Sequence, residues 1–272
     1  MKGMILQYTS SNGQVFDLKV APFRTRTADY TSYNWTPQVI NQQYGANVYR
    51  FDKNVKTYQT VLTVFGSDAE RRQWLNLLHA AFEHDIFTMT PGRISHGIYY
   101  IECYIVSSAV AYSKPWTNNT ISIYTPYPFW RRDIDYSLSA DAGVDNTYEW
   151  LDYPHGFPYD YKATLPGYSM ITNPGVKAAD WKLTIKGRVE NPVVVIDGRS
   201  IGVNAVIGSD ETLVISSRDK TVMKGETNLF NSRIKSPEFF DPIPSGEHSV
   251  MWSGLYDVDL TVYEERSEPL WI

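Results

Sequence analysis

The sequence predicts two domains: an α+β domain of mainly antiparallel strands with one helix, followed by an all-β sandwich domain. The chain has 272 residues, about the length of two average domains. Its first half holds one segment with a clear helical period among strand-like runs. Its second half shows seven short apolar alternations separated by turn residues. Together these observations favour a mixed N-terminal domain and a purely β C-terminal domain.

The first well-marked element is a strand at residues 55–65, where β-branched and aromatic residues dominate. Tyr58, Leu62 and Val64 fall on one parity, as expected for a strand that buries one face. Gly66 then interrupts the alternation and ends the strand.

A helix is predicted directly after this strand. Ser67 followed three residues later by Glu70 forms a capping box, so the helix should begin at Asp68 and run to about His84. Its apolar face is expected at three- and four-residue spacing: Trp74, Leu77, Leu78, Ala81 and Phe82. The charged residues expected off this face are Arg71, Arg72 and Glu83. We expect Trp74 to anchor the helix in the N-terminal core.

The remaining strands are predicted from apolar alternations between turns. In the N-terminal half they cover 98–112 and 120–125, around a connection at 116–119. In the C-terminal half they cover 167–172, 181–189, 193–196, 200–206, 212–216, 249–253 and 256–263. Asn-Pro, Asp-Gly and Pro-Ser-Gly sequences separate them. Seven closely spaced short strands predict a sandwich or jelly roll.

A change in charge and composition marks the domain boundary. Residues 1–136 carry a net charge of +3, whereas residues 137–272 carry −8. The segment 137–166 alone carries −4, is rich in proline and glycine, and shows no sustained period. We therefore predict an N-terminal domain at 1–136, a linker at 137–166 and a C-terminal domain at 167–272.

Composition excludes several classes of protein. The net charge of −5 argues against nucleic acid as the main partner. Cys103 is the only cysteine, which rules out an intrachain disulfide framework and a multi-cysteine zinc site. The apolar runs are too short for a signal peptide or a membrane span, so we expect assembly in a cytoplasm.

The sequence lacks the common catalytic motifs. It contains no glycine-rich phosphate loop, no Gly-x-Ser-x-Gly elbow and no local Ser/His/Asp or Cys/His set. His79 and His84 lie five residues apart on the predicted helix, which is poor spacing for a shared metal. Cys103 lies inside a predicted strand and is interpreted as a buried thiol. We expect no enzyme activity, no metal and no cofactor.

Two carboxylate pairs leave an alternative open. Asp133 with Asp135, and Asp257 with Asp259, each share a strand parity. Paired carboxylates serve glycosidase chemistry or calcium binding. We favour the simpler interpretation that both pairs face water from the edges of strands.

The clearest interface candidates lie just before the predicted linker. They are aromatic and arginine residues, the types that dominate interface hot spots: Tyr127, Phe129, Trp130, Arg131 and Arg132. A packed domain edge explains the same composition equally well. A second, basic set could meet an acidic partner or be ordinary solvated charge: Arg24, Arg26, Arg71 and Arg72.

The order of several short stretches gives the chain a family resemblance. Near the N-terminus these are residues 8–13 and 16–18, and at the end of the first domain 121–124 and 126–130. In the second domain they are 171–175, 181–187, 190–192, 211–215 and 243–248. In this order and spacing, the chain resembles the distal tail proteins of long-tailed, non-contractile bacteriophages.

The resemblance implies a structural hub. In that family the N-terminal domains form a hexameric ring at the tip of the tail tube. The ring joins the tube to tail-associated hub, baseplate and receptor-binding proteins. The C-terminal domain is a galectin-like sandwich that lies outside the ring. The resemblance therefore implies a virion protein for host adsorption, without nucleic-acid or membrane binding.

The alternative function is a carbohydrate-binding adhesion module that recognises host cell-wall polysaccharide. Galectins bind sugar through a His-x-Asn-x-Arg strand. Here Asn231, Ser232 and Arg233 match only its final part, and Leu229 stands in place of the histidine. The resemblance to galectins is therefore taken as one of shape, and sugar binding stays open as the alternative.

Overall fold

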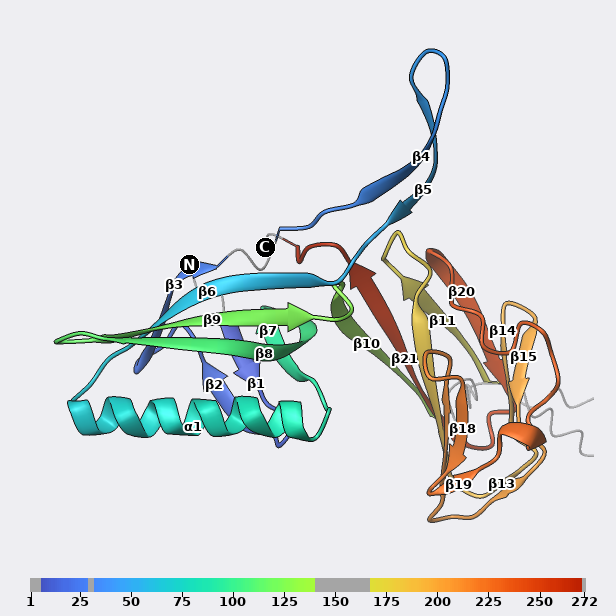
Figure 1. The fold of residues 1–272 in the computed structure, drawn as a ribbon. Coiled ribbons are helices and arrows are strands. Elements are labelled where there is room, and N and C mark those ends of the chain that lie inside the picture. The colour runs from blue at the N-terminus through green and yellow to red at the C-terminus, as the bar shows by residue number, and fades with distance from the viewer. Residues whose placement is uncertain (1–5, 29–31, 140–166, 271–272) are drawn as a thin grey trace, which may run out of the picture. The chain divides into compact units, whose positions relative to one another are not determined.

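The computed structural model describes residues 6–28, 32–139 and 167–270, which form two compact units (Figure 1). Unit 1 comprises the residues up to Arg132 together with those from Arg266 onward, and unit 2 runs from Asp133 to Glu265. Most of the predicted linker at 137–166 lies outside the described residues.

Unit 1 consists of antiparallel strands and one long helix. Its elements are β1 (Leu6–Thr9), β2 (Val15–Asp17), β3 (Phe23–Ala28), β4 (Thr36–Asn41), β5 (Ala46–Asp52), β6 (Lys56–Val64), α1 (Asp68–Phe87), β7 (Gly92–His96), β8 (Tyr99–Tyr112), β9 (Thr117–Thr125) and the start of β10 (Trp130–Leu138). The predicted strands at 55–65, 98–112 and 120–125 are confirmed as β6, β8 and β9. Residues Thr117 to Asn119, expected to be a connection, already belong to β9.

The long strand β8 takes part in two sheets of unit 1. Its first residues pair with β7, and Tyr100 pairs with Arg131 of β10. Beyond Tyr104 it pairs with β9, with a register shift between Ile105 and Ser107. The first sheet continues from β7 to β1 and β2, and the second from β9 to β6 and β3. Because β8 is shared by both sheets, the buried residues of the two sheets and of α1 form one hydrophobic core.

The start of α1 follows the local sequence signal. The Ser67 side chain accepts a hydrogen bond from the Glu70 backbone, and the Glu70 carboxylate accepts one from the Ser67 backbone N–H at 2.8 Å. The predicted capping box and the start at Asp68 are thus confirmed. The helix ends at Phe87, three residues beyond the predicted end.

The buried face of α1 differs from the prediction in two ways. Leu77 is 38% exposed, whereas Leu75 is buried in its place. Arg71, expected to be off the buried face, is only 5% exposed and forms an ion pair with Asp68. The spacing of apolar residues in the sequence predicted a buried face that is rotated slightly from the observed one. The reason is that polar side chains with bonding partners occupy both ends of the observed face.

Unit 2 is all-β apart from one short 3-10 helix among its described residues. Its elements are the end of β10, then β11 (Gly167–Asn173), β12 (Asp180–Lys186), β13 (Val189–Glu190), β14 (Val193–Ile196), β15 (Arg199–Gly202), β16 (Val206–Ile207), β17 (Thr212–Ser216), β18 (Thr221–Lys224), β19 (Thr227–Asn228), η1 (Phe230–Ser232), β20 (Gly246–Trp252) and β21 (Asp257–Arg266). All seven predicted strand regions contain strands, and β18 and β19 are additional.

Two antiparallel sheets of unit 2 enclose its core. One follows the order β19-β18-β17-β12-β21-β10, and the other β11-β20-β14-β15. Trp181 and Leu183 from the first sheet pack in the same core as Ile171 and Val250 from the second. Leu138, at the end of β10, also belongs to this core. Along each strand, every second side chain points into this shared core, so the two sheets pack face to face as the predicted sandwich.

None of the helices in the described part of the chain has the length and apolar composition needed to cross a lipid bilayer.

Candidate interaction surfaces

Strands β4 and β5 form a hairpin that projects from unit 1, and we call residues 36–52 the arm (Figure 1). In the described chain neither strand pairs with any strand except the other. The turn at its tip is closed by a hydrogen bond from the Gln42 N–H to the Gly45 carbonyl at 2.9 Å, with Gly45 at a φ of +85°. Such a two-stranded hairpin receives no support from a third strand.

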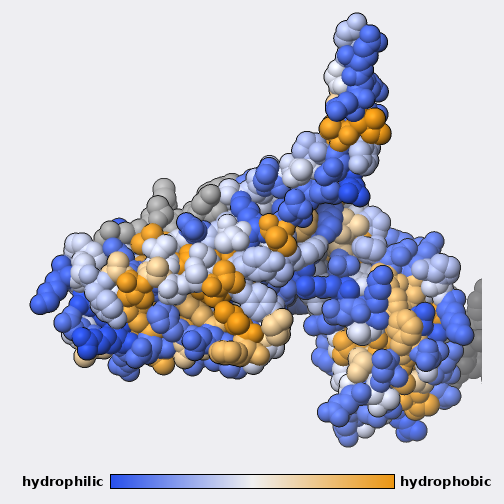
Figure 2. Space-filling view, viewed as in Figure 1, coloured by the Kyte–Doolittle hydropathy of each residue, from blue (hydrophilic) through white to orange (hydrophobic). Residues whose placement is uncertain are grey.

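The register of the arm separates an apolar face from a polar one. Pro37 lies opposite Phe51, and Val39 lies opposite Val48, so these four side chains share one face. Phe51 is 57% exposed, and the two valines are 43% and 44% exposed. Figure 2 shows a hydrophobic group on the arm below its tip.

The opposite face of the arm is mostly polar. It carries Gln38 opposite Arg50, and Ile40 opposite Asn47. The Arg50 Nε lies 2.8 Å from the Asp52 carboxylate, so the charges of this face neutralise each other. The arm is therefore amphipathic, with its apolar side uncovered.

The base of the arm is held by an aromatic cluster. Trp35, just before β4, meets the edge of the Phe129 ring at a centroid distance of 6.0 Å. The Lys53 ammonium, just after β5, lies 4.0 Å from the Phe129 centroid and 5.4 Å from that of Trp35. Tyr127 lies 5.0 Å from Phe129. One of the predicted interface residues, Phe129, thus anchors the arm to the body of unit 1, and Tyr127 packs beside it.

The five predicted interface residues do not share one surface, and two must be corrected. Trp130 is fully buried in the core of unit 1, and Arg131 is 3% exposed beside Glu102 at 3.3 Å. Consecutive strand residues face opposite sides, and both sides are covered here: Trp130 packs in the core, while the Arg131 guanidinium lies beside Glu102 and 4.8 Å from the Tyr127 ring centroid. Tyr127, Phe129 and Arg132 remain half-buried.

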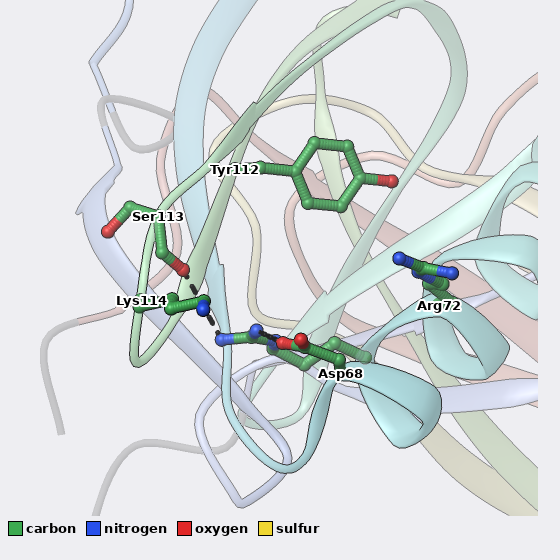
Figure 3. Close-up of a pocket in the computed structure, with 6 residues that line it drawn as sticks. Asp68, Arg72, Tyr112, Ser113 and Lys114 are labelled. Carbon is green, nitrogen blue, oxygen red and sulfur yellow. Dashed lines mark hydrogen bonds and ion pairs between the residues drawn. The ribbon is translucent and has the colours of Figure 1, made fainter.

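A pocket of about 350 Å³ lies at the start of α1 (Figure 3). Arg71 is one of its lining residues: its guanidinium pairs with Asp68 and donates to the Ser113 carbonyl at 3.4 Å. Arg72 and Lys114 are exposed at its mouth. The pocket thus suits a carboxylate better than a cation. Of the other predicted basic residues, Arg24 is exposed on β3, and Arg26 lies in a stretch whose side chains lie outside the described ones.

The most tightly bonded polar group in unit 1 is Asp85, near the end of α1. Its carboxylate accepts hydrogen bonds from the Tyr8 hydroxyl, from the Ser10 hydroxyl at 2.6 Å, and from the Ser11 N–H and hydroxyl at 2.8 and 2.7 Å. The side chain has no exposure to solvent. Burial opposes the charged form, but the hydrogen bonds from Ser10, Tyr8 and Ser11 outweigh it and lower the pKa of Asp85.

This network is structural in its geometry. Tyr8 is buried, and both burial and the neighbouring Asp85 raise the pKa of its phenol. Every oxygen of the carboxylate is occupied by a donor from the same chain, so none is directed at a cavity. The sequence patterns missed Asp85, because its partners lie more than seventy residues away.

The carboxylate pairs lie on strands, as expected. Asp133 and Asp135 are exposed on β10, and Asp135 accepts a hydrogen bond from Thr261 at 2.7 Å. Asp257 is exposed, and Asp259 forms an ion pair with Lys186 at 2.6 Å. Among the described residues, no three histidine, cysteine or acidic side chains group as metal ligands would.

The single thiol is buried, and each of the two helix histidines lies beside a serine hydroxyl. Cys103 is fully buried in β8, and burial raises the pKa of its thiol. The interpretation of Cys103 as a buried core residue is confirmed. His79 is half-buried and lies 2.9 Å from the Ser108 hydroxyl, while His84 lies at the exposed end of α1 beside Ser11 at 3.0 Å.

The partial galectin motif is not on a strand. Asn231 and Ser232 lie in η1, and the Arg233 guanidinium lies 3.8 Å from the ring centroid of Phe230. Arg233 also donates to the Phe230 carbonyl at 2.7 Å. These residues therefore close a local turn and do not form a sugar-binding strand.

The fold matches solved phage proteins over nearly the whole chain. SPP1 Dit, described as a paradigm of the hub adsorption apparatus in phages that infect Gram-positive bacteria, superposes with a TM-score of 0.57 and 9% identity. The superposition covers 96% of this chain and 99% of SPP1 Dit. The chain shares the SPP1 Dit fold. No protein-family model matches the sequence, and no curated protein matches it either.

The phage P2 baseplate in its activated conformation gives a similar result. A chain of the calcium form superposes with a TM-score of 0.63 and 13% identity, covering 98% of this chain and all of that one. A chain of the strontium form gives a TM-score of 0.63, 12% identity and 97% coverage of this chain. The likeness to SPP1 Dit and this baseplate supports the resemblance on which the sequence interpretation was based.

Proposed function

We propose that this protein is a structural virion protein that forms a hexameric hub at the end of a phage tail. The proposal rests on the structural likeness to SPP1 Dit and to a P2 baseplate chain. This likeness covers nearly all of this chain and of those two chains. Because both units are included, the likeness concerns the whole architecture and not one common β-fold.

The two units have separate roles in this proposal. The N-terminal domain at 1–136 forms the ring, and its partners are the tail tube and tail-associated hub proteins. The C-terminal domain at 167–272, beyond the linker at 137–166, is a galectin-like sandwich outside the ring that docks receptor-binding or baseplate proteins. The protein is placed in the virion, and its action in host adsorption is mechanical and not enzymatic.

The chemistry of the described residues supports a scaffold. The best-bonded carboxylate, Asp85, is occupied within the chain, and the only thiol is buried. The exposed features are the apolar face of the arm and the basic pocket beside α1. Features of these two kinds typically bind other proteins.

Electron microscopy of the purified protein tests this function directly. We expect sixfold rings with peripheral lobes, and a solution mass six times the chain mass of 31.1 kDa. A protein that stays monomeric at all concentrations and does not join tail-tip proteins would contradict the proposal.

A further inference from the structure

We propose that the outer edge of β11 binds an extended segment of another tail protein, which adds to the sheet of unit 2 as a further strand. This inference rests on the proposed function and deepens it, because it names the surface and the kind of partner with which the C-terminal domain docks. The edge consists of the backbone groups of Tyr168 and Met170 that point away from β20.

Strand β11 ends the sheet β11-β20-β14-β15, and in the described chain it pairs with β20 alone (Figure 1). In an antiparallel pair the backbone groups of alternate residues point toward the partner strand, and those of the residues between point away. The N–H and C=O of Thr172 both bond the Tyr136 hydroxyl, at 2.9 Å each, so they point away from β20. Met170 and Tyr168 lie two and four residues before Thr172, so their backbone groups point the same way.

Tyr136 shows how a partner would bind to this edge. Its hydroxyl donates to the Thr172 carbonyl and accepts from the Thr172 N–H, which are the two bonds that a residue of an added strand would make. The contact closes the edge at Thr172 and leaves the two preceding outward positions open. Unpaired N–H and C=O groups at two-residue spacing match another extended backbone, so the edge selects a strand and not a helix.

The edge has none of the usual protection against strand addition. Edge strands are commonly blocked by charged residues, proline or a bulge. The sequence of β11 contains no charged residue and no proline, and its register with β20 has no shift. The opposite edge of the same sheet, at β15, is covered: Val203 forms a bridge with Arg233, and the Ile234 N–H donates to the Gly202 carbonyl at 2.9 Å.

The side chains beside the edge suit an apolar partner strand. Tyr168 lies opposite Met251 of β20, and the Tyr168 hydroxyl donates to the Met170 sulfur at 3.0 Å. On the outer face of the sheet these three side chains are 57%, 38% and 46% exposed, in the order Tyr168, Met251 and Met170. Tyrosine and methionine are enriched in protein interfaces. The added strand would continue this row, so we expect it to carry apolar residues at alternate positions.

Symmetry and charge favour another protein over a second copy of this chain. Two β11 edges that face each other are related by a twofold axis, whereas neighbouring copies in the proposed ring all point the same way around it. Residues 167–272 carry 11 Lys and Arg against 15 Asp and Glu, so two C-terminal domains repel each other. A neutral or basic segment of a different protein meets no such repulsion.

Replacement of Met170 by proline tests the edge directly. The Met170 N–H points away from β20, so Met170→Pro removes a bond to the partner strand and none within the sheet. Met170→Leu is the matched control, because it keeps the N–H and an apolar side chain of similar size. Val195→Lys is the second control, because Val195 lies beside Met251 on the same outer face but two strands away from the edge.

Binding would be measured with the full-length chain. The wild type and the three variants would each be titrated with the other tail proteins of the same phage, purified singly, and folding would be checked by circular dichroism. Hydrogen exchange of the wild type adds a measurement that needs no variant. In the free protein the amides of Tyr168 and Met170 should exchange faster than those of Ser169 and Ile171, which bond β20.

The expected result is specific to the edge. One tail protein should bind the wild type and slow exchange at Tyr168 and Met170 by about tenfold or more. Met170→Pro should weaken this binding by about tenfold or more, and Met170→Leu and Val195→Lys by less than about twofold.

Four outcomes would overturn the inference. The first is that no tail protein binds the wild type, and the second is that the amides of Tyr168 and Met170 are already slow in the free protein or are unchanged by binding. The third is that Val195→Lys weakens binding as much as Met170→Pro does, because the partner would then lie on the face of the sheet. The last is self-association that Met170→Pro abolishes, because the occupant would then be a second copy.

Failure of the proposed function gives a different result. A wild type that forms no ring and binds no tail protein refutes both the hub and the edge contact. Rings that bind a tail protein equally well with and without Met170→Pro leave the hub intact and refute only the edge contact.

Discussion

Replacement of Asp85 tests whether one buried carboxylate holds the end of α1 against the N-terminal strand. The four hydrogen bonds it accepts come from Tyr8 in β1 and from Ser10 and Ser11 just after it. The same segments also meet at Ser11 and His84, whose side chains lie 3.0 Å apart, and through the rings of Tyr8 and Phe82 at a centroid distance of 5.1 Å. Asp85→Ala removes the acceptor and leaves buried donors, including the Ser10 hydroxyl, without a partner.

The expected magnitude follows from the number and type of these bonds. A hydrogen bond to a charged group contributes about 1.5–3 kcal/mol, and an unsatisfied buried donor costs about 1–3 kcal/mol, but such contributions are not additive. We therefore expect Asp85→Ala to lower the free energy of unfolding of unit 1 by about 4 kcal/mol. Asp85→Asn keeps one oxygen toward Ser10 and Ser11, but it loses the charge and puts an NH2 group where an oxygen accepted from the Tyr8 hydroxyl, so its cost should be about 2 kcal/mol.

The pH dependence provides a second, independent measurement. The folded-state pKa of Asp85 lies below its unfolded value of about 3.9, so the folded state binds the proton less readily than the unfolded chain does. The stabilisation from the ionised carboxylate is thus fully present above about pH 5 and lost as the pH falls through the folded-state pKa. The difference in free energy of unfolding between the wild type and Asp85→Asn should therefore become smaller as the pH is lowered.

Chemical denaturation of the wild type and both variants between pH 3 and pH 7 measures these quantities. The reasoning would be refuted if Asp85→Ala were within about 1 kcal/mol of the wild type at pH 7. It would also be refuted if the gap between the wild type and Asp85→Asn widened as the pH fell.

Three further predictions concern the core of unit 1. Gly92→Ala should destabilise by about 3 kcal/mol in urea denaturation, because a Cβ there would lie 2.3 Å from an Asp85 oxygen; a change under about 1 kcal/mol would show that the site has room. Trp74→Ala should cost about 2–3 kcal/mol, at the low end for tryptophan, because the side chain is half-buried and packs on Phe23 at 5.7 Å. A Trp74→Ala variant of unchanged stability that fails to assemble would instead place Trp74 at an interface. Cys103 should resist a thiol reagent in the native protein and react fully in guanidinium, since burial raises the pKa of its thiol; rapid native labelling would contradict this.

The sequence predicted an element well when the interactions that define it lie within a few residues of each other along the chain. The capping box at Ser67 fixed the start of α1, because both of its hydrogen bonds lie within four residues. The parity of Tyr58, Leu62 and Val64 identified the buried side of β6 for the same reason. The buried face of α1 was less well predicted. Asp85 belongs to that face only because hydrogen-bond partners from a distant part of the sequence meet it in the tertiary fold.

The interface residues show the limits of composition. Trp130 and Arg131 have the side chains of a hot spot, but the fold of unit 1 buries Trp130 in the core and Arg131 beside Glu102. The arm was missed for a different reason. Val48 and Phe51 have opposite parity, so simple alternation assigns them to opposite faces, and only the register shift between Gln38 and Val39 brings them to one side.

The low identity between this chain and its structural neighbours shows how far this fold tolerates replacement of its residues. At 9–13% identity, almost every side chain differs from SPP1 Dit and the P2 baseplate chain, yet the fold is kept along almost the entire length. A core tolerates such replacement when volume and apolar pattern are preserved. A catalytic site does not, because it needs particular groups at fixed positions. The two cores of this chain, each built from buried apolar residues, therefore keep the fold while most other side chains change.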